Sequence, residues 1–510
     1  MGKRIIRCTA LFIVFSMIFL LSFGCAGNTG GTSDSQNTGT GTQKPTEAEK
    51  PTVLKLLVGA WRATDYKTLT TDLIQENTNT ILEVSSVPFA DYVTKLNVVM
   101  ASSDYPDIIN ITQDAQELTF AEAGMLLPLN NYFDKYTNLA AVRNDTVWKA
   151  MTHKDGNIYA IPIGADPVQR CLLYRGDWLK KLSLDVPATL DEYYDVAYAV
   201  SHQDPDGNNE KDTYAIIGQL GDIAFTFDHI FAAFGVQASY WLERDGKVVN
   251  GTVMPEAKEA LKFINKMYMN KLIDPEFVTD NPDRYKNKTY EGIAGAFVFF
   301  THVIDVNNND NHYKPFKDRN PNGEYIAGEL LETPGYNKIG FRTLGGRGWL
   351  KTGVVSKSPN IDAVLRVLDY VATEEYQTIY SYGIEGEHFT VENGIVNVTA
   401  DADTLASVGT NLFAIPIIRT VRYEHASMHY RDTLKKWADS ALPSAIDGML
   451  LPELNESDLL DSFTKEQYLK MIVGETPIDG GFESFVTEWN NRGGKELVDA
   501  VNREYESRKN

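Results

Sequence analysis

A chain of 510 residues, 43% of them hydrophobic, is long enough for two or three domains and apolar enough to give each a core. The formal net charge of -21 at pH 7 excludes binding to nucleic acid or to anionic lipid through a broad basic surface. Because Cys8 and Cys25 both lie near the N-terminus, Cys171 has no disulfide partner in the body of the chain, and we expect it to be a small buried hydrophobe.

Residues 1–24 predict a secretory signal peptide. A positively charged start precedes an apolar run over residues 10–23, which is too short for a stable membrane span. Cys25 follows this run in a pattern that resembles the signal of bacterial lipoproteins, where the cysteine is lipidated, for example with palmitate. Ser22 departs from that pattern, which has leucine at this place, and an ordinary secretory signal cut near Ala26 is the alternative. The lipoprotein interpretation implies a lipid anchor on the outer face of the cell membrane and no other membrane contact.

Residues 25–51 predict a disordered linker. They are rich in Gly, Ser, Thr, Asn and Gln and hold almost no apolar side chain, so burial cannot offset the entropy of ordering them. A flexible tether between the lipid and a folded body is the role that suits this composition. We expect the folded body to begin at Thr52.

The first part of the body has the order of a βαβ unit. Residues 53–58 and 81–84 predict strands, and apolar residues at 92, 96, 99 and 100 share one helical face ahead of a short strand near 108–109. After the turn residues 155–157, alternating apolar positions predict a further strand. These elements indicate an α/β fold with a partly parallel sheet.

A second group of elements begins at Leu172. Residues 172–174 predict a buried strand, and Thr189 predicts the N-cap of a helix, with Glu192 three residues later completing a capping box. This helix ends in the acidic loop 204–212. Further along, residues 241–249 predict a hairpin and Pro255 begins an amphipathic helix.

The last third adds more strands and helices. Residues 295–300 predict a buried strand, and residues 307–323, rich in Asn, Asp and Pro, predict a long surface loop. Residues 352–355 predict another strand, and residues 361–371 predict a helix.

Several phrases in chain order resemble the extracellular solute-binding proteins of bacterial ABC importers, in particular their lipoprotein branch that handles sugars. They are YVTKLNVVMASSDYPDII at 92–109, EAGMLLPLNNYFDKY at 122–136, LLYRGDWLKKL at 172–182 and YGIEGEHF at 382–389. The resemblance implies an α/β, two-lobed periplasmic-binding-protein-like fold with hinge strands and an interlobe cleft. The implied N-terminal lobe is 52–165 plus about 346–405, and the implied C-terminal lobe is 166–345 plus about 406–510.

The resemblance also implies capture rather than catalysis. A monomer would bind a small molecule, a carbohydrate and more specifically an oligosaccharide, and deliver it to the membrane subunits of an ABC importer. The chain has no G-x-S-x-G, H-E-x-x-H, P-loop or C-x-x-C motif. Two alternatives stay open: a ligand-sensing lipoprotein that serves a membrane kinase, and a secreted glycan-active enzyme, because two separated carboxylates need no local motif.

The acidic loop predicts a structural Ca²⁺ site, because it offers hard oxygen donors at alternate positions. Position 6 of this calcium-loop pattern is Asn209 in place of Gly, and position 12 is Ala215 in place of the bidentate Glu. Asn tolerates the left-handed backbone that position 6 requires. A solvated acidic turn is the alternative. The predicted ligands are Asp204, Asp206, Asn208, the carbonyl of Glu210, and Asp212.

The predicted ligand site uses aromatic and planar polar side chains in loops at strand ends, because sugar rings stack on flat faces. Trp61 and Trp349 are the best candidates, since each lies beside a Gly-containing turn. Packing in a core is the alternative for any one of these residues. The full predicted set is Trp61, Arg62, Asp107, Trp241, Phe300, Arg347, Trp349 and Tyr382.

Overall fold

The computed structural model describes residues 50–510 except 61–65, 103, 144, 164–169, 220, 222, 301–312, 342–346, 349, 394, 411–431, 433–438, 441, 443, 456 and 510. The predicted signal peptide, Cys25, Trp61, Arg62 and Trp349 therefore lie outside the described residues. Within the described ranges, no helix is both long and apolar enough to cross a membrane.

The first sheet has five strands in the order β2-β1-β3-β11-β4. Strand β1 pairs in parallel with β2 and β3, while β11 runs antiparallel between β3 and β4. The carboxyl ends of β1, β3 and β4 and the amino end of β11 therefore meet at one edge. The bounds are β1 Thr52–Ala60, β2 Thr80–Pro88, β3 Ile108–Ile111, β4 Ala160–Ile163 and β11 Leu350–Val354.

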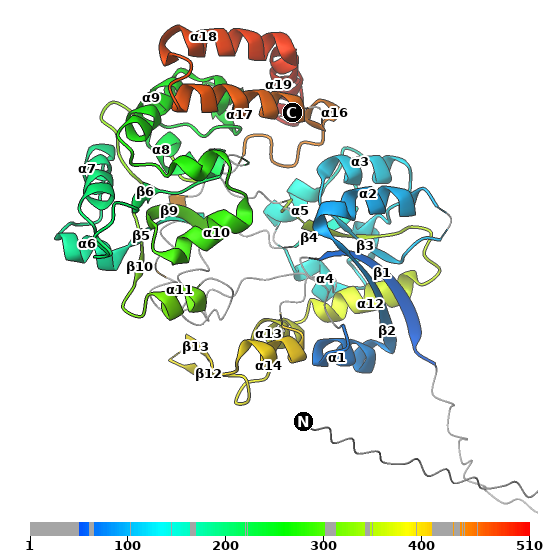
Figure 1. Ribbon diagram of the computed structural model, residues 1–510. Coiled ribbons are helices and arrows are strands. Elements are labelled where there is room, and N and C mark those ends of the chain that lie inside the picture. The colour runs from blue at the N-terminus through cyan, green and yellow to red at the C-terminus, as the bar shows by residue number, and fades with distance from the viewer. Residues whose placement is uncertain are drawn as a thin grey trace, which may run out of the picture. The chain divides into compact units, whose positions relative to one another are not determined.

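Helices cover both faces of this sheet (Figure 1). Side chains alternate along β1, so that Leu56 packs with Ile74 and Leu368 on one face while Leu57 packs with Leu96 on the other. The predicted stripe on the second helix is confirmed in α2. The helices of this part are α1 Leu69–Thr78, α2 Phe89–Met100, α3 Asp114–Glu122, η1 Leu129–Tyr132, α4 Thr137–Ala141, α5 Asp145–Met151, α12 Ile361–Val371 and α13 Glu374–Tyr382.

The second sheet has four strands in the order β10-β5-β9-β6. Strand β5 runs antiparallel to β9, and β9 runs parallel to β6. The amino end of β5 therefore shares an edge with the carboxyl ends of β9 and β6. The bounds are β5 Arg170–Arg175, β6 Tyr214–Ile216, β9 Ala294–Phe300 and β10 Tyr325–Ala327, with a separate hairpin of β7 Trp241–Arg244 and β8 Lys247–Asn250 where one was predicted.

A third, larger core packs helices around the second sheet. Thr189 caps α7 as predicted, because its Oγ1 accepts from Glu192 N at 3.2 Å and Glu192 Oε2 accepts from Thr189 N at 3.2 Å. The predicted loop at 307–323 contains a short helix instead, because Phe316 is fully buried and stacks on Tyr325. These helices are α6 Gly176–Leu182, α7 Leu190–His202, α8 Ile223–Ala233, α9 Pro255–Met269, α10 Pro282–Glu291 and α11 Tyr313–Arg319, with the 3-10 turns η3 Gly251–Val253 and η4 Pro275–Val278.

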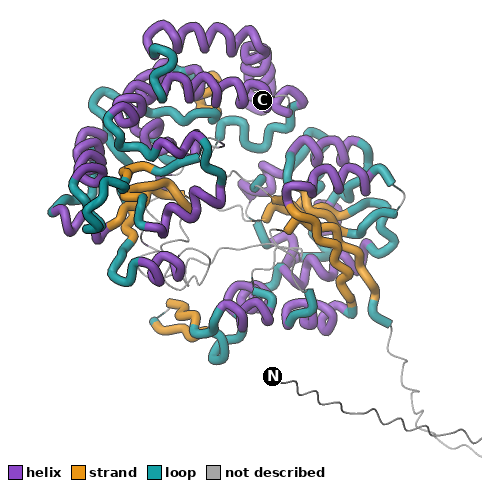
Figure 2. The backbone as a smooth tube through the Cα atoms, in the orientation of Figure 1, coloured by secondary structure: helices purple, strands orange, loops and turns teal. Residues whose placement is uncertain are grey.

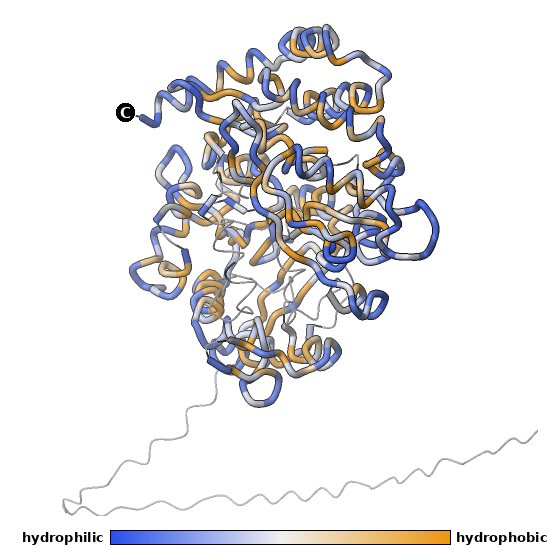
Figure 3. Tube along the Cα trace, turned by 90° about the vertical axis from the view of Figure 1, so that its left-hand side faces the viewer, coloured by the Kyte–Doolittle hydropathy of each residue, from blue (hydrophilic) through white to orange (hydrophobic). Residues whose placement is uncertain are grey.

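The C-terminal helices join this larger core. Helix α17 packs on α9, and Tyr468 Oη donates to Thr252 O at 2.6 Å. Figure 2 shows the sheets with helices around them, and in Figure 3 hydrophobic and hydrophilic positions alternate along the outer helices, as expected when a helix buries one face. The remaining elements are β12 Phe389–Glu392, β13 Ile395–Val398, α14 Ala402–Val408, α16 Pro452–Asn455, α17 Asp458–Ile472, α18 Ile478–Trp489, η7 Asn490–Gly494 and α19 Lys495–Lys509.

Candidate functional site

The shared edge of the first sheet is the natural place for a ligand, because open α/β sheets bind ligands at the carboxyl ends of their parallel strands. Trp61 and Arg62 directly follow β1, which ends here at Ala60. Trp349 directly precedes β11, which begins here at Leu350, and Arg347 lies three residues before the strand. Of these four predicted residues the structure describes Arg347, whereas Trp61, Arg62 and Trp349 lie outside the described residues.

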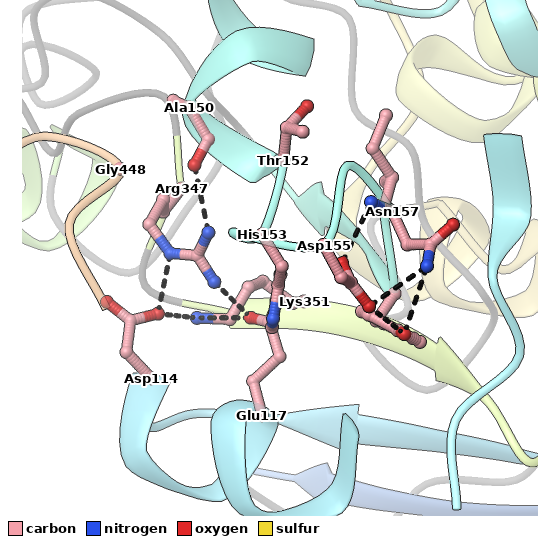
Figure 4. Close-up of polar contacts among 12 residues, drawn as sticks. Asp114, Glu117, Ala150, Thr152, His153, Asp155, Asn157, Arg347, Lys351 and Gly448 are labelled. Carbon is pink, nitrogen blue, oxygen red and sulfur yellow. Dashed lines mark hydrogen bonds and ion pairs between the residues drawn. The ribbon is translucent and has the colours of Figure 1, made fainter. Parts of the chain in front are cut away.

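Arg347 lies in a cluster of charged side chains at this edge (Figure 4). Its Nη2 is 2.6 Å from Glu117 Oε2, its Nε is 3.1 Å from Asp114 Oδ1, and its Nη1 donates to Ala150 O at 2.9 Å. Lys351 Nζ is 2.8 Å from Asp114 Oδ1, and His153 Nε2 is 2.9 Å from Glu117 Oε1. We call Asp114, Glu117, His153, Arg347 and Lys351 the edge cluster.

Local geometry explains how α3 contributes two carboxylates to the edge cluster. Helix α3 begins just past the carboxyl end of β3, so its first turn lies at the shared edge of the first sheet. Asp114 and Glu117 are three residues apart and therefore lie on the same side of the helix. Their position in the first turn is favourable for negative charge, because the N-terminal end of the helix dipole is positive.

The edge cluster has a buried base and an exposed tip. The side chains of Glu117 and Lys351 are 0% and 1% exposed, whereas that of Asp114 is 45% exposed. Burial by itself raises the pKa of Asp114, but the charges of Lys351 and Arg347 outweigh burial and lower this pKa to about 2. In Glu117 burial is likewise outweighed by Arg347, His153 and Lys351, so its pKa is also lowered. Asp114 therefore presents an ionised carboxylate, which accepts hydrogen bonds.

Asp107, predicted as a ligand-binding residue, lies at the opposite edge of the sheet. It precedes β3 and is 4% exposed. Its carboxylate accepts from Lys55 N at 2.7 Å and from the Ser358 hydroxyl and the Asn360 amide. These bonds tie β1 to the residues before α12, so Asp107 has a structural role.

Two predicted aromatic residues are used in packing. Trp241 begins β7 and is buried in the larger core. Tyr382 ends α13, and its ring packs on Phe389 with 5.6 Å between ring centroids. Neither residue lies at a carboxyl edge of the two sheets. Phe300, in contrast, ends β9 at the edge of the second sheet, although its side chain lies outside the described part of the structure.

The edge of the second sheet carries a buried ion pair that sequence reasoning missed. Arg170 begins β5 and pairs in register with Phe300. Its Nη1 is 3.3 Å from Asp228 Oδ2 on α8, and the two side chains are 7% and 0% exposed. No local motif indicates this pair, because its partners are far apart in the sequence.

The acidic loop 204–212 folds around the Asp204 carboxylate. Asp204 Oδ1 accepts from the backbone N–H groups of Gly207 at 2.9 Å and Asn208 at 3.1 Å, and Oδ2 accepts from Asn209 N at 3.1 Å. Asn209 has φ 64°, which confirms the left-handed backbone expected at position 6. Asn208 Nδ2 donates to both oxygens of Asp212 at 3.1 Å.

Two carboxylates of this loop share a hydrogen bond. That bond to Asp206, together with the backbone donors, lowers the pKa of Asp204. Burial and the same bond raise the pKa of Asp206. Two carboxylates held this close compete for one proton, and a divalent cation would relieve their repulsion. The donor set is therefore suited to Ca²⁺.

A second group of acids has the spacing of a metal site, but a lysine side chain lies among its carboxylates. Asp274, Glu276 and Asp280 could hold a metal ion by distance. Lys288 Nζ lies 2.5, 2.8 and 2.5 Å from their oxygens, respectively, and is 1% exposed. The ammonium group therefore takes the place that a cation would need.

Comparisons with known proteins agree on one family. Residues 60–378 match the model of a family described as bacterial extracellular solute-binding protein. The lipoprotein LipO of Bacillus subtilis is 25% identical over 454 residues, covering 86% of this chain and 88% of that protein. The polygalacturonan/rhamnogalacturonan-binding protein YtcQ of the same organism is 24% identical over 455 residues, covering 83% and 85%.

Solved structures show the same fold. The Streptococcus pneumoniae substrate-binding protein FusA in complex with kestose has a TM-score of 0.70 at 20% identity, covering 90% of this chain and 99% of that one. An EF-hand mutant of FusA, in complex with fructo-nystose, has a TM-score of 0.69 at 20% identity with the same coverage. These likenesses confirm the predicted α/β, two-lobed periplasmic-binding-protein-like fold.

Proposed function

Because the chain belongs to the bacterial extracellular solute-binding protein family, we propose that it captures an oligosaccharide outside the cell and delivers it to the membrane subunits of an ABC importer. The observation that carries this proposal is the edge cluster, which holds one ionised, half-exposed carboxylate on a rigid buried base at the ligand edge of the first sheet. The names of YtcQ and of FusA, both sugar-binding proteins, support a carbohydrate.

The proposed site divides the work between polar and aromatic groups. Asp114 accepts hydrogen bonds from sugar hydroxyls, and Arg347 and Lys351 hold its carboxylate in place without reaching the ligand themselves. Trp61 and Trp349 supply flat faces beside them, because both positions adjoin the same edge in the chain. Arg62 and Phe300 stay proposed ligand contacts, whereas Asp107, Trp241 and Tyr382 are no longer part of the proposed site.

Capture in this proposal works through a population shift. The ligand binds across two lobes, with the boundaries that the family resemblance implies, and stabilises the closed arrangement. The importer then recognises the closed form, so that no chemical step on the sugar is required. A lipid on Cys25 and the tether 25–51 keep the protein at the outer face of the membrane.

We also propose that loop 204–212 holds a structural Ca²⁺. Asp204, Asp206, Asn208 and Asp212 supply side-chain oxygens, and Glu210 supplies its carbonyl. The bound ion would neutralise the paired carboxylates and stiffen the connection from α7 to β6. Adding Ca²⁺ to EDTA-treated protein should raise the melting temperature, and Asp204→Asn should abolish the rise. An unchanged melting temperature would contradict the calcium proposal and leave a solvated turn.

A thermal-shift screen tests the proposed function. The purified protein is heated with neutral oligosaccharides, uronic-acid oligomers and peptides in parallel, and we expect only saccharides to raise the melting temperature. Asp114→Asn should weaken the apparent affinity for the saccharide by about tenfold, because a charged hydrogen-bond acceptor is lost, and the shift in melting temperature should become smaller. Asp362→Asn, at an exposed carboxylate on α12, serves as the matched control and should leave the shift intact. A response to peptides alone would disprove the carbohydrate assignment.

A further inference from the structure

A small pocket opens into the larger core, and none of the residues that line it belongs to the edge cluster. The hairpin of β7 and β8, the first turn of α17 and the end of α18 surround it. Its volume is about 70 Å³, which equals the space of about two water molecules in the liquid. Its polar lining includes Ser239, Trp241, Asn250, Ser457, Asp461 and Trp489.

The walls of this pocket hold hydrogen-bond donors without an acceptor. Asn250 is 7% exposed, and its Oδ1 accepts from Thr252 N at 3.0 Å, but no described residue accepts from its Nδ2. Trp241 and Trp489 are both buried, and neither indole N–H has an acceptor within the part of the chain that the structure describes. A buried donor that makes no hydrogen bond is unfavourable, so these groups favour a guest that brings oxygen atoms into the pocket.

The mouth of the pocket is acidic, which limits the kind of guest. Asp461 lines the pocket and is partly exposed, and Asp458 is exposed in the same first turn of α17. These carboxylates repel an anion, although the N-terminal end of the helix by itself would attract one. The guest therefore has to accept hydrogen bonds inside the pocket and donate one at its mouth. Neutral hydroxyl groups do both, whereas an ammonium group can only donate.

From this arrangement we propose that the pocket is a second saccharide site, which takes the hydroxymethyl arm of a hexose. The arm is one carbon and one hydroxyl group, which suits a space of about two water molecules, while the pyranose ring stays at the mouth. The indoles of Trp241 and Trp489 offer apolar surface to the carbon and donors to the oxygen. A hydroxyl group of the ring donates to the carboxylate of Asp461. This site does not depend on capture at the edge cluster.

A pair of matched sugars tests this assignment by fluorine NMR. The purified protein, labelled with fluorotryptophan, is titrated with methyl glucoside and with methyl xyloside, which has the same ring without the hydroxymethyl arm. The signals of Trp241 and Trp489, assigned with Trp241→Phe and Trp489→Phe, report on the pocket. We expect both signals to shift and to saturate at millimolar methyl glucoside. The affinity for methyl xyloside should be weaker by about tenfold or more, because the hydrogen bonds of the arm are lost.

Two results would overturn the proposal. One is a shift that grows in proportion to the sugar concentration without saturating, and the other is an equal affinity for the two glycosides. Either result would leave a pocket that holds only water. The proposed capture of an oligosaccharide is measured separately, by calorimetry, so a failure of that function and a failure of this site are distinguishable.

Variants in the pocket give a second readout. Asn250→Asp keeps the oxygen that accepts from Thr252 N and removes the amide donors, so the affinity for methyl glucoside should fall by about tenfold or more. Asp461→Asn removes the charged acceptor at the mouth and should also weaken binding. The matched control is Asp458→Asn, an exposed acid of the same helical turn that does not line the pocket, and it should leave the affinity unchanged.

Thermal unfolding checks that the three variants are folded. If Asn250→Asp does not fold, Asp461→Asn still tests the mouth of the pocket. Methyl glucoside that binds to the folded pocket variants as tightly as to the parent protein would contradict the proposed site.

Discussion

Removing the Arg347 side chain should destabilise the first lobe strongly. In Arg347→Met, Glu117 stays 0% exposed and loses an ion pair of 2.6 Å, while Lys351 Nζ remains 3.8 Å away. Breaking one partner of a buried pair costs about 3 to 5 kcal/mol, and we expect the lower end, because Lys351 and His153 still face Glu117. For a domain of about 150 to 250 residues, 3 kcal/mol lowers the melting temperature by about 6 to 12 °C.

Calorimetric melting of two further variants tests whether the loss comes from the buried charge. Arg366→Met breaks an exposed pair with Asp362, with side chains 43% and 58% exposed, and should cost no more than about 0.5 kcal/mol. Adding Glu117→Gln to Arg347→Met should recover part of the loss, because no buried charge is then left unpaired. If Arg347→Met melts within 1 °C of the parent protein, the edge cluster is not the rigid base described above.

Three further changes probe other parts of the fold. Burial lowers the pKa of His229 to about 3, so the unfolded chain takes up a proton at a higher pH than the folded protein does. The free energy of unfolding should therefore fall by about 4 to 5 kcal/mol as the pH drops from about 6.5 to 3. Urea titrations should show a weaker dependence of this free energy on pH for His229→Gln, and an identical dependence in both proteins would refute the assignment. Lys288→Met leaves Asp274 and Asp280 buried without their ammonium partner and should lower the free energy of unfolding by about 3 to 5 kcal/mol. The control Lys470→Met, at an exposed ion pair, should lower it by less than about 1 kcal/mol. Equal losses in the two variants would contradict the role of the buried cluster. Thr189→Ala removes the cap of α7 and should cost about 1 kcal/mol in urea unfolding, while no loss would show that the capping box contributes nothing.

Features encoded in a short segment could be predicted from the sequence. The capping box of α7 needs only Thr189 and Glu192, and both hydrogen bonds are present. The left-handed Asn209 follows from its place in an acidic loop. Likewise, the helical spacing of the apolar residues in α2 can be recognised without knowing which elements the helix packs against.

The candidate site could be predicted only in part, because its members come from distant segments. Arg347 and Lys351 bond to Asp114 across 233 and 237 residues of chain. Chain order indicated that Arg347 lies near a strand end, yet nothing local shows that it faces two carboxylates. Asp107 and Trp241 also follow sequence that is typical of loops. In the structure, however, Asp107 bonds to β1 and Trp241 is buried in the larger core.

Titration calorimetry with chromatography of the recovered ligand tests the central claim most directly. The account predicts that one molecule of an oligosaccharide binds per chain and is recovered chemically unchanged after incubation. Steady conversion of the sugar to smaller products, without a stable complex, would contradict capture and favour a glycan-active enzyme.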